Sequence, residues 1–180
     1  RWNVGFDFST QRVRKTLNPA KREDNMVVQN AYAFHTNYRS ENGRYWLLGS
    51  FSRMKHVVNE IGGIVPTSVD PSSLYFTYED AKVWLQESRA RELRQEYHLY
   101  QEFKLGNGLQ FYHVLDRKNQ ALVFESLLSG SDGLFFPKER LIDPDSTQNR
   151  NDFAEWRNEL GLKGTYKGFY YNTYAKLRNG

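Results

Sequence analysis

YFTYEDAKVWLQESRARELRQEYHLYQE, residues 75–102, is the stretch from which the fold is predicted. Its apolar residues recur at spacings of three, four or eight, as on one face of a helix; they are Ala81, Trp84, Leu85, Leu93, Tyr97 and Tyr100. Thr77 suits a helix N-cap, and no proline or glycine interrupts before Gly106. The pattern predicts a helix of about 26 residues, roughly 39 Å long.

The sequence on either side of this helix indicates strands and short helices. Residues 2–9 alternate apolar and polar side chains, which predicts a strand. Residues 26–38 and 44–51 flank Asn42-Gly43, a strong hairpin signal. The further elements expected are a helix over 53–61, a hairpin of 109–115 with 120–128, a helix over 152–160 and a strand over 165–177.

These elements predict an α+β fold. Two hairpin-plus-helix units would build one or two antiparallel sheets, with the long helix packed across them. We expect residues 1–180 to form a single domain, or two related halves, 1–63 and 74–180, joined by a linker over 64–73.

Composition limits the functional classes. The chain has 180 residues and no cysteine, which excludes disulfides, cysteine-ligated zinc and cysteine nucleophiles. No apolar run approaches the ~20 residues of a membrane-spanning helix. The first residue is Arg1, so we expect a piece of a longer protein. On these grounds we predict an intracellular protein that does not contact a membrane.

Charge is distributed unevenly along the chain. Residues 1–60 contain ten Lys/Arg and five Asp/Glu, and residues 163–180 contain four Lys/Arg and no acid. Residues 61–162 contain eleven Lys/Arg and sixteen Asp/Glu. Basic ends that meet in the fold would form one positive face, as on proteins that bind nucleic acid.

Aromatic residues make up 16% of the chain, and several alternate with basic ones. Such interleaving is typical of proteins that bind single strands, where bases stack on rings and cations follow the phosphates. We therefore predict a nucleic-acid-binding domain that prefers single-stranded DNA or RNA. The candidates for phosphate contacts are Arg12, Arg14, Lys15, Lys21, Arg22, Arg39, Arg44, Lys167, Lys176 and Arg178, and those for stacking are Tyr45, Trp46, Tyr170 and Tyr171.

Two alternatives remain open. The long helix and the many rings suit a protein-interaction or assembly domain of a larger complex, such as a viral particle, or a homo-oligomer paired through the helix. A metal-dependent nuclease is the second alternative, on Pro144-Asp145 with Glu155 and Arg157. His98, Glu102 and His113 are a weak zinc candidate. No catalytic residue, metal site or cofactor is assigned, which favours a protein that is not an enzyme.

Overall fold

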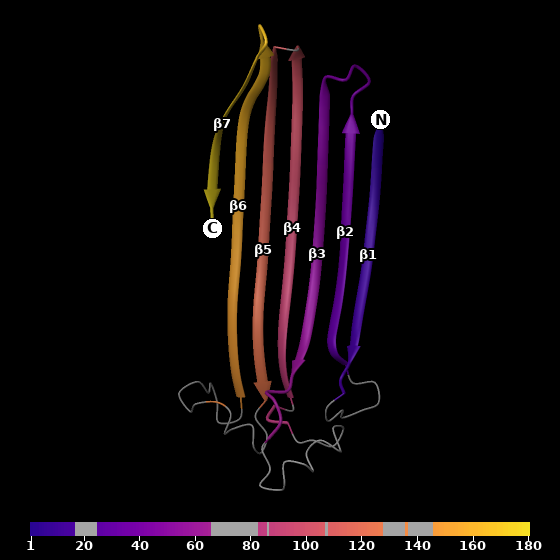
Figure 1. The fold of residues 1–180 in the computed structure, drawn as a ribbon, viewed down its shortest axis with the longest axis vertical. Coiled ribbons are helices and arrows are strands. Elements are labelled where there is room, and N and C mark those ends of the chain that lie inside the picture. Colours follow the sequence, from indigo (N-terminus) through magenta and orange to yellow (C-terminus); the bar gives the residue numbers. More distant parts are fainter. Residues whose placement is uncertain (17–24, 66–82, 86, 107, 128–135, 137–145) are drawn as a thin grey trace.

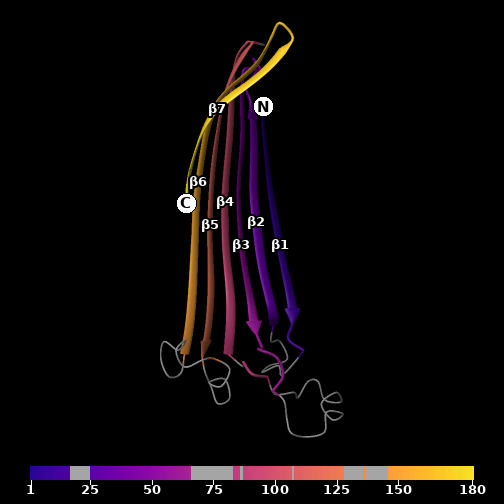
Figure 2. The ribbon, with the colours of Figure 1, turned by 60° about the vertical axis from the view of Figure 1, so that its left-hand side comes forward.

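The computed structural model describes residues 1–16, 25–65, 83–85, 87–106, 108–127, 136 and 146–180, and within them it contains strands and no helix. The strands are β1 (Trp2–Arg14), β2 (Asn25–Arg39), β3 (Tyr45–Glu60), β4 (Glu87–Gly106), β5 (Leu109–Leu127), β6 (Ser146–Tyr166) and β7 (Phe169–Asn179). All seven belong to one sheet, in which each strand pairs antiparallel with the next along the chain. Figures 1 and 2 show this sheet as a single long, twisted layer.

The links between strands differ at the two ends of the sheet. At one end the links are short: residues 40–44 after β2, 107–108 after β4 and 167–168 after β6. At the other end, residues 15–24, 61–86 and 128–145 connect the strands. Lys167 and Gly168 both have positive φ, 46° and 85°, as a tight two-residue hairpin requires. We call the first end the short-turn end; it is uppermost in Figure 1.

The sheet has very little conventional core. Among the described residues, only Val83, Leu85, Tyr112 and Val114 are buried apolar side chains. Large apolar side chains remain exposed instead, including Phe6 at 66% and Leu160 at 61%. A soluble domain would cover one face of such a sheet with a second layer, because exposed apolar area is costly in water. In the described part of the chain, no helix is long and apolar enough to cross a membrane.

The predicted α+β fold is wrong, because each predicted helix that can be examined is a strand. The C-terminal part of the expected long helix is β4, the 53–61 helix lies mostly within β3, and the 152–160 helix lies within β6. Residues 75–82 of the expected long helix lie outside the described residues. The expected hairpin around residues 116–119 is one continuous strand, β5.

Two predictions of local structure are confirmed, and both concern the N-terminal part of the chain. Residues 2–9 lie in β1, and the Asn42-Gly43 turn joins β2 to β3. Gly43 has φ of 66°, and Asn42 Oδ1 accepts a hydrogen bond from the Arg44 amide. The division into domains stays a prediction, since most of the linker predicted over 64–73 lies outside the described residues.

Candidate functional site

Alternation along the strands gives the sheet two different faces. Phe6, Phe34, Phe51 and Tyr97 are directly opposite one another in the register of β1 to β4, so their side chains share a face. We call it the apolar face. Successive residues point to opposite sides of a strand, so Asp7 and its register partners lie on the other face, the polar face.

Aromatic rings form two rows across the apolar face. The row toward the short-turn end comprises Tyr38, Tyr45, Phe103, Phe111, Tyr166 and Phe169. The second row, further along the strands, comprises Phe8, Tyr32, Phe51, Tyr97 and Trp156. Neighbouring rings are in contact within the rows: Phe51 and Tyr97 have centroids 4.7 Å apart, and Tyr38 and Tyr45 6.1 Å. Between the rows lie apolar residues such as Leu99 and Leu115.

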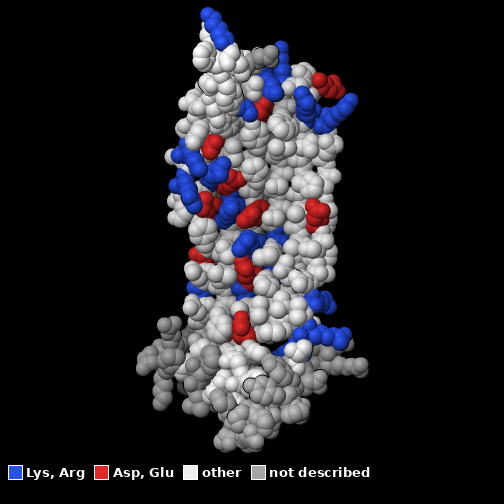
Figure 3. Space-filling model, in the orientation of Figure 1, with Lys and Arg blue, Asp and Glu red and all other residues white. Residues whose placement is uncertain are grey.

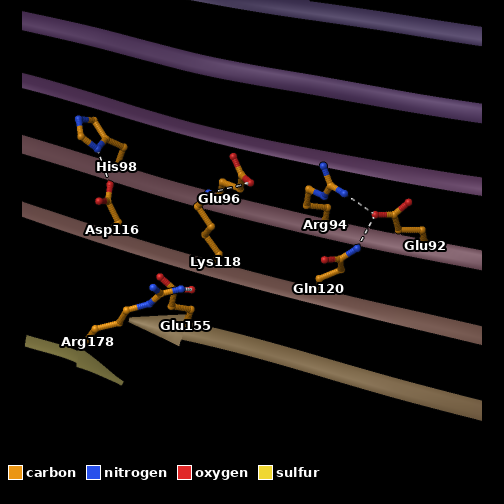
Figure 4. A network of polar contacts seen from close by, with 9 residues as sticks. All are labelled: Glu92, Arg94, Glu96, His98, Asp116, Lys118, Gln120, Glu155 and Arg178. Atoms are coloured by element: carbon orange, nitrogen blue, oxygen red, sulfur yellow. Dashed lines mark hydrogen bonds and ion pairs between the residues drawn. The ribbon is translucent and has the colours of Figure 1, made fainter. Parts of the chain in front are cut away.

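Ion pairs cross the polar face from strand to strand. His98 Nδ1 lies 2.5 Å from Asp116 Oδ1, and Arg157 Nε lies 3.3 Å from the other oxygen of Asp116. Arg178 Nη2 contacts Glu155 Oε2 at 2.8 Å. Figure 3 shows positive and negative side chains interleaved over the middle of this face, and Figure 4 shows part of the network from close by.

Further pairs continue the network along β4 and β5. Glu92 accepts hydrogen bonds from Arg94 at 2.9 Å and Gln120 at 2.8 Å, and Lys118 lies 3.7 Å from Glu96 (Figure 4). Most of these groups are partly exposed, so each pair adds little stability by itself. Together they make a hydrated, charge-balanced surface.

A denser polar cluster occupies the polar face near the short-turn end. Glu102, only 3% exposed, accepts from Lys163 Nζ at 2.8 Å and from the Tyr100 hydroxyl at 2.6 Å. The Tyr112 hydroxyl donates to Glu159 or Asn172, at 3.3 and 3.2 Å. The Tyr112 ring leans over Gly161, its register partner, where a Cβ atom would overlap the ring. The missing side chain at Gly161 therefore sets the position of this tyrosine.

The predicted nucleic-acid contacts are dispersed over the sheet. Arg12 and Arg14 lie at the end of β1 remote from the short turns, and Lys15 follows them and is 9% exposed. Arg39 and Arg44 flank the turn between β2 and β3. Lys21 and Arg22 lie outside the described residues.

The remaining candidates lie four or five strands away from the β2–β3 turn. Lys167 is in the turn between β6 and β7, and Lys176 and Arg178 are on β7. The charge of Arg178 is paired with Glu155. The candidate cations that the structure describes are therefore not gathered into one site.

The four candidate stacking rings are also divided between the two faces. Tyr45 is on the apolar face, where its hydroxyl donates to Gln101, and Trp46 is on the polar face against Tyr100. Tyr170 and Tyr171 point to opposite faces, as adjacency in a strand requires. The Tyr171 hydroxyl donates to the Gly108 carbonyl.

The three residues of the metal candidate do not lie together, and the nuclease candidate is described only in part. His98 and Glu102 lie on the polar face, whereas His113 is on the apolar face. Glu155 and Arg157 lie on β6, and Asp145 is outside the described residues. No cluster of three or more potential metal ligands occurs within the described ranges.

Sequence reasoning missed the residues that distinguish the two faces. The signal that could have identified them is the alternation of charged and apolar side chains, with a period of two, in residues 88–103. Its even positions carry Glu92, Arg94, Glu96 and His98, and its odd positions include Leu93, Tyr97, Leu99 and Phe103.

The antiparallel sheet is uncovered, and its two faces differ: one is apolar and carries two rows of rings, and the other is charged. This is the architecture expected of a membrane-spanning β protein. The comparison with known families agrees. The model of a family described as "Putative porin" matches residues 1–180, so the chain belongs to this porin family. No curated protein and no solved structure matches the chain significantly.

Membership of the porin family overturns the functional predictions. The prediction of a nucleic-acid-binding domain with a DNA or RNA partner is wrong, and neither an assembly domain nor a nuclease fits the family. The predicted intracellular location and lack of membrane contact are also wrong, since a porin family points to an outer membrane. The long helix through which copies were expected to pair is replaced, over residues 87–102, by β4.

Proposed function

We propose that the seven strands form part of the wall of an outer-membrane pore through which small polar solutes diffuse. In this arrangement the apolar face contacts lipid, and the polar face borders water in the lumen. The observation that carries the proposal is the difference between the two faces: between the aromatic rows one face carries mainly rings and aliphatic groups, while ion pairs run from β4 to β7 on the other. The Arg91–Glu125 pair on the apolar face lies beyond the second row, further from the short-turn end.

The physical argument begins with solvation. Lipid cannot hydrogen-bond to backbone groups, so a spanning sheet must satisfy them between its strands. Each interior strand, β2 to β6, is hydrogen-bonded on both sides. Rings of tyrosine, phenylalanine and tryptophan favour the membrane–water interfaces, and the apolar face carries such rings in two separated rows.

The stagger of the short turns supports strands that are tilted in a membrane. Tyr38, Leu47, Leu160 and Ala175 lie on one register row across the sheet. In the β2–β3 hairpin the register pair next to the turn, Arg39 with Trp46, lies one residue nearer the short-turn end than this row. In the β6–β7 hairpin the corresponding pair, Tyr166 with Phe169, lies six residues nearer that end. The turns are therefore offset by five residues, roughly 17 Å along the strands, across four strand spacings, which together measure roughly 19 Å. If the turns lie at one membrane surface, the strands tilt by about 40°, within the usual range for barrels. Figure 1 shows the turns rising from β2–β3 to β6–β7.

A cysteine-modification experiment tests the proposal. Ser50 and Phe51 are neighbours on β3 with opposite orientations, and the chain has no native cysteine. Ser50→Cys and Phe51→Cys variants of the full-length protein would be reconstituted into planar bilayers and treated with a water-soluble, sulfonate-bearing methanethiosulfonate. We expect a stepwise fall in current for Ser50→Cys and none for Phe51→Cys.

The wild-type protein is the control for the reagent, since residues 1–180 offer no thiol. Current block at both positions would show that the apolar face is not shielded by lipid, and block at Phe51→Cys alone would show that the two faces are assigned the wrong way round. Absence of any current from the wild-type protein would contradict the proposal that the protein forms a pore.

A further inference from the structure

A row of hydrogen-bonded polar side chains interrupts the apolar face across four strands. The Tyr45 hydroxyl donates to Gln101 Oε1 at 3.0 Å. Gln101 Nε2 lies 3.3 Å from His113 Nδ1, and His113 Nε2 lies 3.0 Å from Asn158 Oδ1. These four residues come from β3, β4, β5 and β6, and we call them the polar row. A lipid-facing surface would not be expected to carry such groups without a reason, because their transfer into hydrocarbon is costly.

The direction of the hydrogen bonds leaves amide donors available. Gln101 donates one N–H to His113 Nδ1, so His113 donates from Nε2 to the Asn158 carbonyl oxygen. Within the described part of the chain, the second N–H of Gln101 and both side-chain N–H groups of Asn158 have no further partner. The row therefore offers donors to a ligand that brings acceptor oxygens.

A groove of about 690 Å³ lies along the polar row. Its walls include Tyr45, Gln101 and His113 together with Phe103, Phe111, Leu160 and Leu162. Asn158, the fourth residue of the polar row, borders the groove through its hydrogen bond to His113 and is not part of the walls. The groove is thus mainly apolar with a few polar groups on one line. This composition suits an amphipathic ligand with a hydrocarbon chain and a small number of oxygen acceptors.

Basic residues surround the short turns next to the groove. Arg44 immediately precedes Tyr45, and its carbonyl accepts from the Lys104 amide at 2.7 Å. Lys167, in the β6–β7 turn, holds its Nζ 5.5 Å from the centroid of the Tyr166 ring on the apolar face. Two further cations at this end lie on the polar face: Lys104, 3.4 Å from Glu102, and Arg39, the register partner of Trp46. Glu41 is the only acid among described residues 39–44, 104–106 and 166–169. Clusters of this kind attract anionic headgroups.

We propose that this groove binds one anionic phospholipid from the leaflet at the short-turn end. Its phosphate lies beside Arg44 and Lys167, its ester carbonyl oxygens accept from Gln101 and Asn158, and an acyl chain packs along Phe103, Phe111 and Leu160. The proposal rests on the membrane-spanning arrangement proposed above. A second copy of the chain is the poorer occupant, because two copies facing each other in one membrane would bring their basic turns together.

Native mass spectrometry of the full-length protein, released from detergent, tests this assignment. The protein would be titrated with phosphatidylglycerol and, separately, with phosphatidylcholine of the same acyl chains. We expect one phosphatidylglycerol to bind at least about tenfold more tightly than phosphatidylcholine. The Gln101→Leu/Asn158→Leu double variant should lose at least about tenfold in phosphatidylglycerol affinity, a change of about 1.4 kcal/mol.

The matched control is Gln95→Leu/Asn119→Leu. These two residues are register partners on the same face of β4 and β5, are of the same two types, and belong neither to the groove nor to the polar row. The control variant should bind phosphatidylglycerol like the wild type. Equal binding by both double variants, or equal affinity for the two lipids, would overturn the proposal. So would a wild-type dimer without bound lipid that the Gln101→Leu/Asn158→Leu variant dissociates.

The two proposals fail in different ways. Suppose that the reagent blocks the current of Ser50→Cys but not of Phe51→Cys while the two double variants bind lipid equally. In that case the proposed pore is supported and only the proposed lipid site is contradicted. If Phe51→Cys is blocked, the apolar face does not meet lipid and both proposals fall.

Discussion

Replacing Leu99 with arginine is expected to destabilise the protein in lipid vesicles by about 2–4 kcal/mol, the cost of arginine on the lipid-facing side deep in a membrane barrel. Leu99 lies between the two aromatic rows, with Gly49 and Leu115 as its register partners. The guanidinium would have no acid beside it on that face and would have to reach an interface. Urea unfolding of the reconstituted protein measures the change in free energy.

The neighbouring residue supplies the control. His98 points to the polar face and pairs with Asp116 at 2.5 Å. His98→Arg introduces the same side chain one position away, where a carboxylate and water are both available, so we expect a change below about 1 kcal/mol. Similar losses for Leu99→Arg and His98→Arg would contradict the assignment of the two faces, because a two-sided aqueous sheet would treat both positions alike.

Gly161→Ala is expected to lower the free energy of unfolding by roughly 3 kcal/mol. The new methyl group would occupy the space of the Tyr112 ring, which is only 8% exposed. Overpacking costs about 1–3 kcal/mol, and displacing the ring also weakens its hydrogen bonding to Glu159 and Asn172, at about 1 kcal/mol per bond. The measurement is again equilibrium unfolding in lipid.

A double-mutant cycle separates the overlap with Tyr112 from other effects of losing a glycine. In a Tyr112→Ala background the added methyl group meets no ring, so Gly161→Ala should cost less than about 0.5 kcal/mol. Gly106→Ala is a second control, because a Cβ there would have no atom within 4 Å. If Gly161→Ala costs the same in both backgrounds, the glycine does not act through Tyr112.

The N-terminal strand and first hairpin could be predicted because their signals are local. Trp2, Val4, Phe6 and Phe8 alternate without exception, and Asn42-Gly43 defines a turn by its own backbone preferences. Neither inference requires knowledge of what surrounds the sheet. The same alternation is weaker in the longer strands, because charged and aromatic residues occur there at both odd and even positions.

The long helix was predicted wrongly because spacings of four and eight are even, and therefore fit a strand as well as a helix. Leu85, Leu93 and Tyr97 satisfy both periods, and only steps of three, such as Tyr97 to Tyr100, favour the helix. Tyr97 and Tyr100 in fact lie on opposite faces of β4. Glutamate, arginine and leucine are also good helix formers, so propensity reinforced the error. Pairing with β3 and β5 decides the structure, and that information is not local.

The site was missed for a related reason. Alternating rings and cations were interpreted as one surface that contacts phosphates. In a strand, however, neighbouring side chains point to opposite faces, and here the two faces meet different media. Tyr45 and Trp46 show this directly, since one faces Gln101 and the other faces Tyr100. Sequence composition indicated that many rings would be exposed, but it could not indicate that the medium on one side is hydrocarbon.

The simple strand order has a consequence for how such a protein can change over time. Each strand forms its backbone ladder only with its neighbours along the chain, and each short turn joins two strands that pair with each other. Duplicating or deleting one pair, for example β4 with β5, would leave every other pairing intact and preserve the assignment of faces. The bore of a channel built in this way could therefore evolve in increments of two strands, without rewiring the rest of the chain.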